Sequence, residues 1–174
     1  MSMKLQVSAN LIVGSDGSTS KNGSSIGLSN PIDRARFHQL RSKCDLILIG
    51  GETARREPYK KTPVPLFIIT HSQVKLQPKN QLAKQINLPP QLALVEIERS
   101  FPEKSEISIL VEAGPKLLQQ MIDLNLIDTF YLTINHTQIG EQKIDYLKML
   151  TGFSLIESSK DLDTELQTYK LTNR

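Results

Sequence analysis

The sequence predicts an α/β fold, in which a mixed, mainly parallel sheet is flanked by helices and followed by an antiparallel hairpin. Two observations support this class. Residues 107–111 are an apolar-rich run of β-branched character that ends at Glu112-Ala113-Gly114-Pro115, and apolar residues at helical spacing follow from Lys116. Residues 46–49, which follow Asp45, are a second continuous apolar run that ends in glycines, as expected of a parallel strand covered on both faces.

The remaining elements follow from local patterns along the chain. Residues 4–13 alternate apolar and polar side chains, which predicts a strand, and Pro31 predicts the first turn of a helix capped by Ser29 or Asn30. Further predictions are a strand over 66–70, at most a short helix over 82–86, a strand over 92–97, a connection without a full crossover helix over 98–106, a strand over 128–133, and the hairpin strands 154–157 and 166–171.

Length, composition and charge indicate the number of domains and argue against nucleic-acid binding. The 174 residues fit one α/β domain, and the 39% hydrophobic and 22% charged contents are ordinary for a globular protein. The formal net charge is only +3, and the lysines are scattered rather than clustered. No basic stripe interleaved with aromatic residues is present, so the sequence predicts no nucleic-acid partner.

The single cysteine and the N-terminal sequence bear on the cellular setting. Because Cys44 is the only cysteine, neither an internal disulfide nor a cysteine-based zinc site can form, and we predict no metal. The first five residues lack the apolar run of a signal peptide, and no apolar run approaches membrane-spanning length. We therefore expect a cytoplasmic protein without a membrane partner.

The strand-turn-helix around Gly114 has the chemistry of an anion site. A helix start carries free N–H groups and a partial positive charge, Pro115 suits its first position, and Gly114 would let a phosphate approach the backbone. Glu112 would stand at the carboxyl end of the strand, where α/β sheets bind ligands. The alternative is that the turn only connects two elements.

A second glycine turn follows the strand over 45–49. Gly50 and Gly51 would free backbone amides for a ligand, with the hydroxyl of Thr53 close behind. The alternative is an ordinary strand-to-helix turn capped by Thr53. The turn is neither a Walker loop nor a Gly-x-Gly-x-x-Gly dinucleotide fingerprint, since both patterns are missing.

Two polar features complete the candidate site. The strand over 4–13 places Asn10 on its polar face, where it could point into a site or lie on an exposed face. The loop over 14–25 is rich in Ser and Gly, which is typical of a flap. On the helix that begins near Pro31, Arg41 adjoins the apolar stripe rather than opposing it.

The order of these motifs resembles the reductase domain of bacterial riboflavin biosynthesis, which has a dihydrofolate-reductase-like fold. The resemblance extends over nearly the whole chain. Its motifs are Asn10 before Ser15-Asp16-Gly17, residues 33–41, Ile49 to Thr53, Glu57-Pro58, residues 111–115 and Leu126-Ile127-Asp128.

The resemblance implies an NADPH-dependent reductase in the riboflavin pathway. Its substrate would be 5-amino-6-(5-phosphoribosylamino)uracil or the related diaminopyrimidine, and its product the ribitylamino compound. The implied cofactor-binding residues are Ile12, Val13, Gly50, Gly51, Thr53, Glu57, Ser72, Gly114, Pro115, Lys116 and Leu117. The implied substrate-binding residues are Asn10, Asp16, Ser25, Arg41, Lys60, Lys61 and Glu112.

The resemblance also assigns roles. Arg41, with Lys60 or Lys61, would neutralise the ribose phosphate, and Glu112 would orient the substrate or relay a proton. The family implies a homodimer. The deaminase that often accompanies the reductase is not expected, because its His-x-Glu and Cys-x-x-Cys ligands are missing from the chain, which we treat as one reductase domain over 1–174.

Departures from the family pattern keep two alternatives open. Gly14 and Gly27 replace a hydroxyl and an aromatic residue, and Arg56-Glu57 stands where two acidic or amide residues are usual. One alternative is a related NADPH reductase of another small carbonyl, imine or pterin. The other is a non-catalytic nucleotide-binding domain.

Overall fold

The fold is built on one eight-stranded sheet. The computed structural model describes residues 3–172. The strand order is β5 (Ala83–Ile86), β4 (Leu66–Ile69), β3 (Leu46–Gly50), β6 (Glu106–Val111), β1 (Lys4–Gly14), β7 (Thr129–Asn135), β10 (Thr164–Leu171) and β9 (Phe153–Asp161). Neighbouring strands from β5 to β7 pair in parallel, and β10 and β9 are antiparallel. The predicted mixed α/β fold with a C-terminal hairpin is confirmed.

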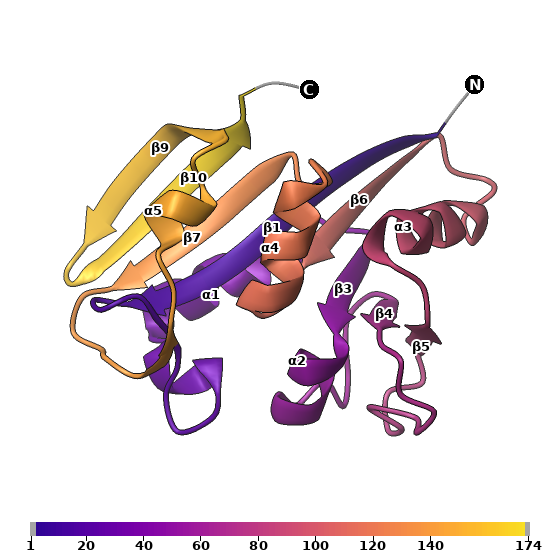
Figure 1. Cartoon of the computed structure of the whole chain (residues 1–174), viewed down its shortest axis with the longest axis horizontal. Coiled ribbons are helices and arrows are strands. Elements are labelled where there is room, and N and C mark those ends of the chain that lie inside the picture. Colours follow the sequence, from indigo (N-terminus) through magenta and orange to yellow (C-terminus); the bar gives the residue numbers. More distant parts are fainter. Residues whose placement is uncertain (1–2, 173–174) are drawn as a thin grey trace.

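Helices cover both faces of this sheet (Figure 1). The larger core packs the sheet against α3 (Pro90–Arg99), α4 (Pro115–Asp123) and α5 (Tyr146–Met149). A smaller core packs the opposite face of β3 and β4 against α2 (Gly51–Arg56) and Tyr59. Helix α1 (Pro31–Arg41) also lies on that second face, where Arg36 donates hydrogen bonds to backbone carbonyls of β7 and β10.

The side chains of the central strand β1 alternate between the two faces of the sheet. Val7, Ala9, Leu11 and Val13 are buried in the larger core. Because successive side chains of a strand alternate, Asn10 and Ile12 face the side of α1 and α2. After β1 the chain runs along that side. Strand β2 (Ser18–Ser20) forms a short ladder there with β8 (Glu141–Lys143), and the 3₁₀ helix η1 (Ser25–Leu28) follows β2.

Two local predictions are wrong, and both concern short segments between prolines. Residues 92–97 belong to helix α3, where Ala93, Leu94 and Ile97 are buried and Leu92 is exposed, which is a helical rather than an alternating pattern. Residues 82–86 contain the edge strand β5, not a helix. A short apolar run fits either state, and here Pro90 begins the helix. Helix α3 also supplies a crossover between β5 and β6, which the predicted connection lacked.

The helix starts agree closely with the patterns that predicted them. Asn30 caps α1, accepting a hydrogen bond from the backbone N–H of Asp33, and Pro115 is the first residue of α4. Helix α2 begins at Gly51 without a side-chain cap, so Thr53 lies inside the helix and does not cap it. Within residues 3–172, no helix is long and apolar enough to cross a membrane.

Candidate active site

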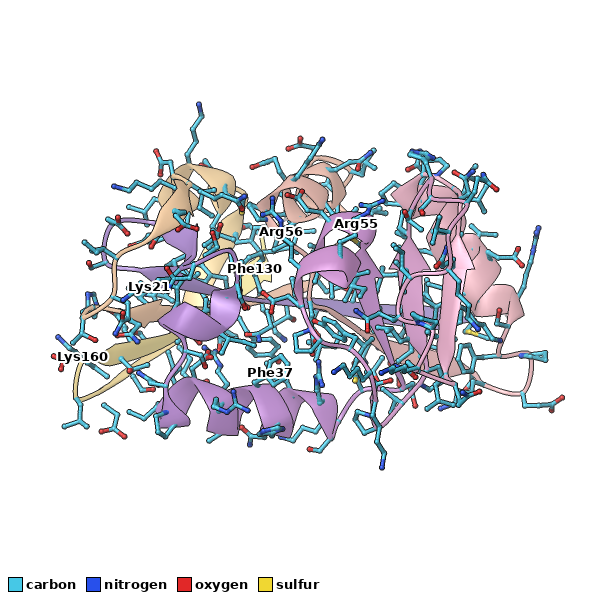
Figure 2. All side chains as sticks on the ribbon, turned by 90° about the horizontal axis from the view of Figure 1, so that it is seen from below. Lys21, Phe37, Arg55, Arg56, Phe130 and Lys160 are labelled. Atoms are coloured by element: carbon cyan, nitrogen blue, oxygen red, sulfur yellow. The ribbon has the colours of Figure 1, made fainter. Side chains whose placement is uncertain are left out.

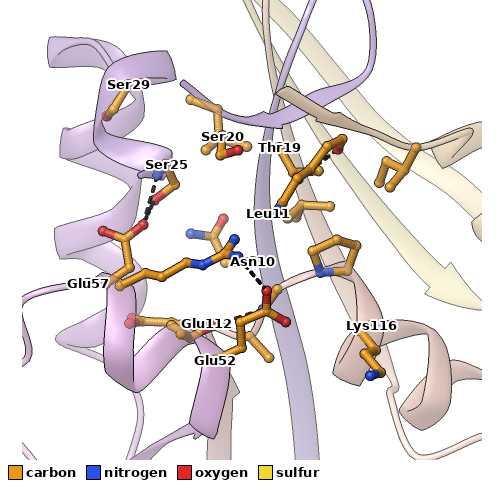
Figure 3. Close-up of a pocket in the computed structure, with 18 of the residues that line it drawn as sticks. Asn10, Leu11, Thr19, Ser20, Ser25, Ser29, Glu52, Glu57, Glu112 and Lys116 are labelled. Atoms are coloured by element: carbon orange, nitrogen blue, oxygen red, sulfur yellow. Dashed lines mark hydrogen bonds and ion pairs between the residues drawn. The ribbon is translucent and has the colours of Figure 1, made fainter. Parts of the chain in front are cut away.

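A cavity of about 440 Å³ opens at the carboxyl ends of β1 and β6, beside α1, α2 and the start of α4 (Figure 3). This is the edge at which parallel sheets bind ligands. The lining residues that the argument uses are Asn10, Ser20, Ser25, Arg34, Phe37, Glu52, Thr53, Arg56, Glu57, Tyr59, Glu112, Gly114, Pro115, Lys116 and Lys143. They come from segments far apart in the chain, which the parallel topology gathers at one edge.

The structure brings half of the predicted site residues into this lining. These are Asn10, Ile12, Ser25, Thr53, Glu57, Glu112, Gly114, Pro115 and Lys116. The predicted residues outside the lining are Val13, Asp16, Arg41, Gly50, Gly51, Lys60, Lys61, Ser72 and Leu117. Val13 is fully buried in the larger core, and Lys60 and Lys61 are exposed beyond the cavity.

Glu112 is held by a bidentate ion pair with Arg41. Arg41 donates from Nε to Oε1 and from Nη2 to Oε2, both at 2.7 Å. The guanidinium lies 4.1 Å from the ring centre of Phe37 and 5.3 Å from that of Tyr59. Burial would lower the pKa of Arg41, but the hydrogen bond and charge of Glu112 outweigh it and raise that pKa. The charge of Arg41 is therefore already balanced by a carboxylate.

Tyr59 completes the set of groups around this carboxylate. Its hydroxyl donates to Oε2 of Glu112 at 2.8 Å, and the residue is 6% exposed. With three donors directed at it, Glu112 serves as a hydrogen-bond acceptor. Burial, together with the neighbouring Glu112 carboxylate, raises the pKa of Tyr59 well above its ordinary value of 10.0.

The raised pKa of Tyr59 predicts a specific loss of stability in alkali. Above pH 10 the unfolded chain releases the Tyr59 proton while the folded chain keeps it, so the free energy of unfolding falls as the pH rises. The slope from this one group approaches about 1.4 kcal/mol per pH unit. Urea unfolding of the wild type and Tyr59→Phe at a series of pH values checks this. The variant should show the shallower slope, and equal slopes would contradict the assignment.

The start of α4 offers backbone N–H groups to a ligand. Gly114 caps the helix without a side-chain hydrogen bond, and its own N–H donates to Oγ1 of Thr53 at 3.1 Å. Pro115 has no N–H, whereas those of Lys116 and Leu117 belong to the first turn and have no acceptor within the helix. A Cβ at Gly114 would meet only Oγ1 of Thr53, at 3.8 Å, so open space adjoins the backbone here.

The other glycine turn is explained by packing. A Cβ on Gly50 would lie 3.2 Å from Cδ2 of Leu117, and one on Gly51 only 2.6 Å from Oγ1 of Thr70. These glycines let the end of β3 approach α4 and β4 closely. Glu52 and Thr53, which follow these glycines in α2, line the cavity, whereas Gly50 and Gly51 do not.

Glu57 fastens the segment after β2 to the end of α2. Its carboxylate accepts hydrogen bonds from Oγ of Ser24 at 2.8 Å and from N and Oγ of Ser25 at 2.7 and 3.0 Å. Figure 3 shows this contact on the side of the cavity opposite Lys116. The predicted flap is thus tied to the cavity wall at Ser25.

Two of the four cations in the lining have an anionic partner in the described part of the chain. Arg56 pairs with Glu52 at 3.0 Å, and Lys143 pairs with Asp16 at 3.0 Å. The hydrogen bond from Ser18, followed by that from Lys143, lowers the pKa of Asp16 far below its ordinary value. Within residues 3–172, no ion pair involves Arg34 or Lys116, which leaves both available to anionic groups of ligands.

Sequence reasoning missed several lining residues. No site role was predicted for Phe37, which Figure 2 shows on the inner side of α1, or for Tyr59. Arg34 lies one residue after Asp33 in the motif that supported the resemblance, and that position was the available signal. Ser20 had none, because its place in the cavity lining follows from the β2–β8 ladder.

Comparisons with known structures agree with this fold. A pyrimidine reductase-like protein from Corynebacterium diphtheriae superposes with a TM-score of 0.72 at 18% identity, over 97% of this chain and 92% of that one. A RibD protein from Acinetobacter baumannii gives 0.73 at 14% identity, over 98% and 59%. The chain thus spans little more than half of that protein.

The fold likeness extends to dihydrofolate reductase. The enzyme from Enterococcus faecalis, solved with NADP(H), gives a TM-score of 0.65 at 14% identity, over 97% of each chain. Among curated protein sequences, no significant match was found. The sequence profile described as the RibD C-terminal domain matches residues 6–163, which is most of the chain. The chain therefore belongs to the RibD C-terminal domain family.

Proposed function

We propose that this protein is an NADPH-dependent reductase of the riboflavin pathway. It would convert 5-amino-6-(5-phosphoribosylamino)uracil, or the related diaminopyrimidine, into its ribitylamino product. The observation that carries the proposal is that the open helix start at Gly114 and the acceptor Glu112 line the same cavity, in a chain of the RibD C-terminal domain family. A substrate-dependent loss of NADPH absorbance tests it, and NADPH oxidation without substrate serves as the blank.

The residues around the start of α4 fit a dinucleotide phosphate. The open space at Gly114, the first-turn N–H groups of Lys116 and Leu117, and the side chain of Lys116 would together hold the pyrophosphate. Thr53 would act by holding the Gly114 turn. Ile12 and Pro115, which also line the cavity, would bound the nicotinamide end. When bound, the cofactor supplies the hydride that reduces C1′ of the sugar.

The protein's own part is orientation and charge compensation. Because Arg41 and Tyr59 both donate to Glu112, we assign Glu112 to orienting the substrate rather than to donating a proton. Among the described cations of the lining, Arg34 lacks an ion pair and lies on α1, away from α4. We therefore propose Arg34 as the partner of the substrate phosphate, in place of Arg41, Lys60 and Lys61.

Arg34→Leu should separate phosphate binding from the rest of the site. We expect KM for the phosphorylated substrate to rise at least about tenfold, since one charged hydrogen-bonding partner is lost. Turnover of the dephosphorylated substrate should change little. Arg99→Leu, on the exposed surface of α3, is the matched control and should leave both values unchanged. An unchanged KM in Arg34→Leu would remove Arg34 from the proposed phosphate site.

One observation favours the second candidate, a reductase of another small carbonyl, imine or pterin. A Cβ on Gly27 would lie 2.8 Å from Cβ of Lys21 and 2.9 Å from its carbonyl oxygen, so the aromatic residue frequent in the family cannot fit here without rearrangement. A panel of such substrates assayed with NADPH decides between the two candidates. The third reading, a non-catalytic nucleotide-binding domain, would require NADPH binding without turnover of any panel member.

The cellular setting and assembly state remain predictions. The homodimer rests on the family resemblance, and light scattering of the purified protein measures it directly. The single reductase domain over 1–174 is likewise a proposal, which activity of this chain without a deaminase would support.

A further inference from the structure

A second cavity lies on the face of the sheet opposite the active-site cavity. It has a volume of about 420 Å³ and opens where β1 begins, between α3 and the segment that follows α4. Its lining combines two charged residues, Lys4 and Glu98, with five apolar residues: Met3, Leu5, Val7, Leu94 and Leu126. The two cavities share no lining residue. This second cavity, called here the α3 groove, is therefore separate from the active site.

Apolar surface continues from the α3 groove onto the helix beside it. Leu92 and Val95 precede Glu98 at intervals of three residues, so the three side chains form one row along α3. Leu92 is 50% exposed and Val95 is 40% exposed. Leu124, two residues before the lining residue Leu126, is 42% exposed. The groove and these three residues form an apolar surface, the α3 face, and such surfaces mark contacts with other molecules.

The α3 groove also offers one charge of each sign. Glu98 is half-buried, and its carboxylate forms no ion pair or hydrogen bond within residues 3–172. Lys4 pairs with Glu106 at 3.1 Å, but the two side chains are 71% and 47% exposed. An exposed pair of this kind contributes little stability, so Lys4 can exchange its partner at small cost.

A second copy of the chain matches all of these features at once. A small ligand in the groove would leave Leu92, Val95 and Leu124 uncovered, and an ion of one sign would leave the other charge unmatched. A two-fold axis places the same surface of two copies face to face, so that every contact occurs twice. Lys4 then meets the partner's Glu98, and Glu98 meets the partner's Lys4. The α3 face is thus complementary to itself in charge as well as in hydrophobicity.

We propose that the α3 face binds a second copy of the chain about a two-fold axis and so forms a homodimer. Leu92, Val95 and Leu124 pack between the copies and supply the affinity, whereas the two pairs of Lys4 with Glu98 fix the orientation. The inference goes beyond the proposed function, because it names the surface through which the chain assembles. The active-site cavity, on the other face of the sheet, stays uncovered.

Sedimentation equilibrium of the whole chain, over a range of concentrations, measures the dissociation constant of the dimer. Val95→Lys should raise this constant at least about a hundredfold, because the charged side chain enters the interface twice. Leu124→Lys replaces this variant if it does not fold. Leu155→Lys, on edge strand β9, changes a leucine that is 49% exposed and is the matched control. It should dimerise as the wild type does.

Three results of this experiment would overturn the inference. The first is a wild type that stays monomeric at every concentration. The second is a dimer that Leu155→Lys disrupts and Val95→Lys does not, which would place the interface on the C-terminal hairpin. The third is an oligomer that grows beyond the dimer with concentration, because a head-to-tail contact, and not a two-fold one, produces open assemblies.

Charge reversal tests the two-fold pairing itself. Lys4→Glu and Glu98→Lys each place like charges opposite each other twice, so each variant alone should dimerise at least about tenfold more weakly than the wild type. In an equimolar mixture, a dimer of one copy of each variant has both opposite-charge pairs again. The mixture should therefore dimerise within about threefold of the wild type. A mixture as weak as the separate variants would show that Lys4 and Glu98 do not meet across the interface.

These measurements need neither substrate nor cofactor, so they are independent of the NADPH assay. A dimer that Val95→Lys dissociates, in a protein without reductase activity, would support the α3 interface and reject the proposed function. Turnover of the ribosylaminopyrimidine by a protein that sediments only as a monomer would support the proposed function and overturn the interface.

Discussion

Arg41→Met is expected to lower the free energy of unfolding by about 3–5 kcal/mol, because it leaves the Glu112 carboxylate buried without its counterion. The Glu112 side chain is 4% exposed and that of Arg41 is 16% exposed, so water cannot replace the lost donors. Urea unfolding measures the change. Lys4→Met, which breaks the exposed pair with Glu106, is the control and should cost less than about 1 kcal/mol.

The double variant Arg41→Met/Glu112→Leu identifies the cause of this loss. Removing both charges should recover much of the stability, since the penalty arises from an unpaired charge rather than from lost packing. A single variant that loses less than about 1 kcal/mol, or a double variant that loses the sum of both single changes, would contradict the ion-pair account.

Gly114→Ala is expected to weaken NADPH binding at least about tenfold while changing the free energy of unfolding by less than about 1 kcal/mol. The backbone at Gly114 is extended, with φ of −69° and ψ of 172°, and any residue adopts it. A Cβ there meets no atom closer than 3.8 Å, so folding does not require glycine. The added methyl group would occupy the space beside the first-turn N–H groups, where a phosphate must approach.

Calorimetric titration with NADPH and thermal unfolding measure the two effects separately. Gly152→Ala is the matched control, because a Cβ at Gly152 meets nothing within 4 Å and this residue is outside the cavity lining. It should bind NADPH as the wild type does. Normal NADPH affinity in Gly114→Ala would show that the start of α4 does not hold the cofactor.

The strands and helix starts with strong local signals could be predicted from the sequence, and the short ones could not. Pro115 after a glycine, at the end of a long apolar strand, indicates one structure. Residues 82–97 lack such a signal, because edge strand β5 has few buried side chains and its pairing with β4 is a tertiary contact. The apolar residues of α3 then fitted a strand as well as a helix.

The residues of the candidate site, too, could be predicted from the sequence only in part. Glu112 and Gly114 were found because they end a strand and begin a helix. The partner of Glu112 could not be found this way, since Arg41 is 71 residues away in the chain and Tyr59 is 53 away. The resemblance assigned the charge of Arg41 to a ligand phosphate, whereas the fold pairs Arg41 with the carboxylate of Glu112. Arg34 gains significance only from the folded chain, where it lines the cavity and has no ion pair within residues 3–172.

Transfer of a labelled hydride tests the proposed reductase activity most directly. The purified protein is incubated with 5-amino-6-(5-phosphoribosylamino)uracil and NADPH that carries deuterium at the transferable position, and the product is analysed by mass spectrometry and NMR. The account predicts loss of NADPH together with one deuterium at C1′ of the ribitylamino product. Saturable NADPH binding with no deuterium in any product of this pyrimidine would contradict it.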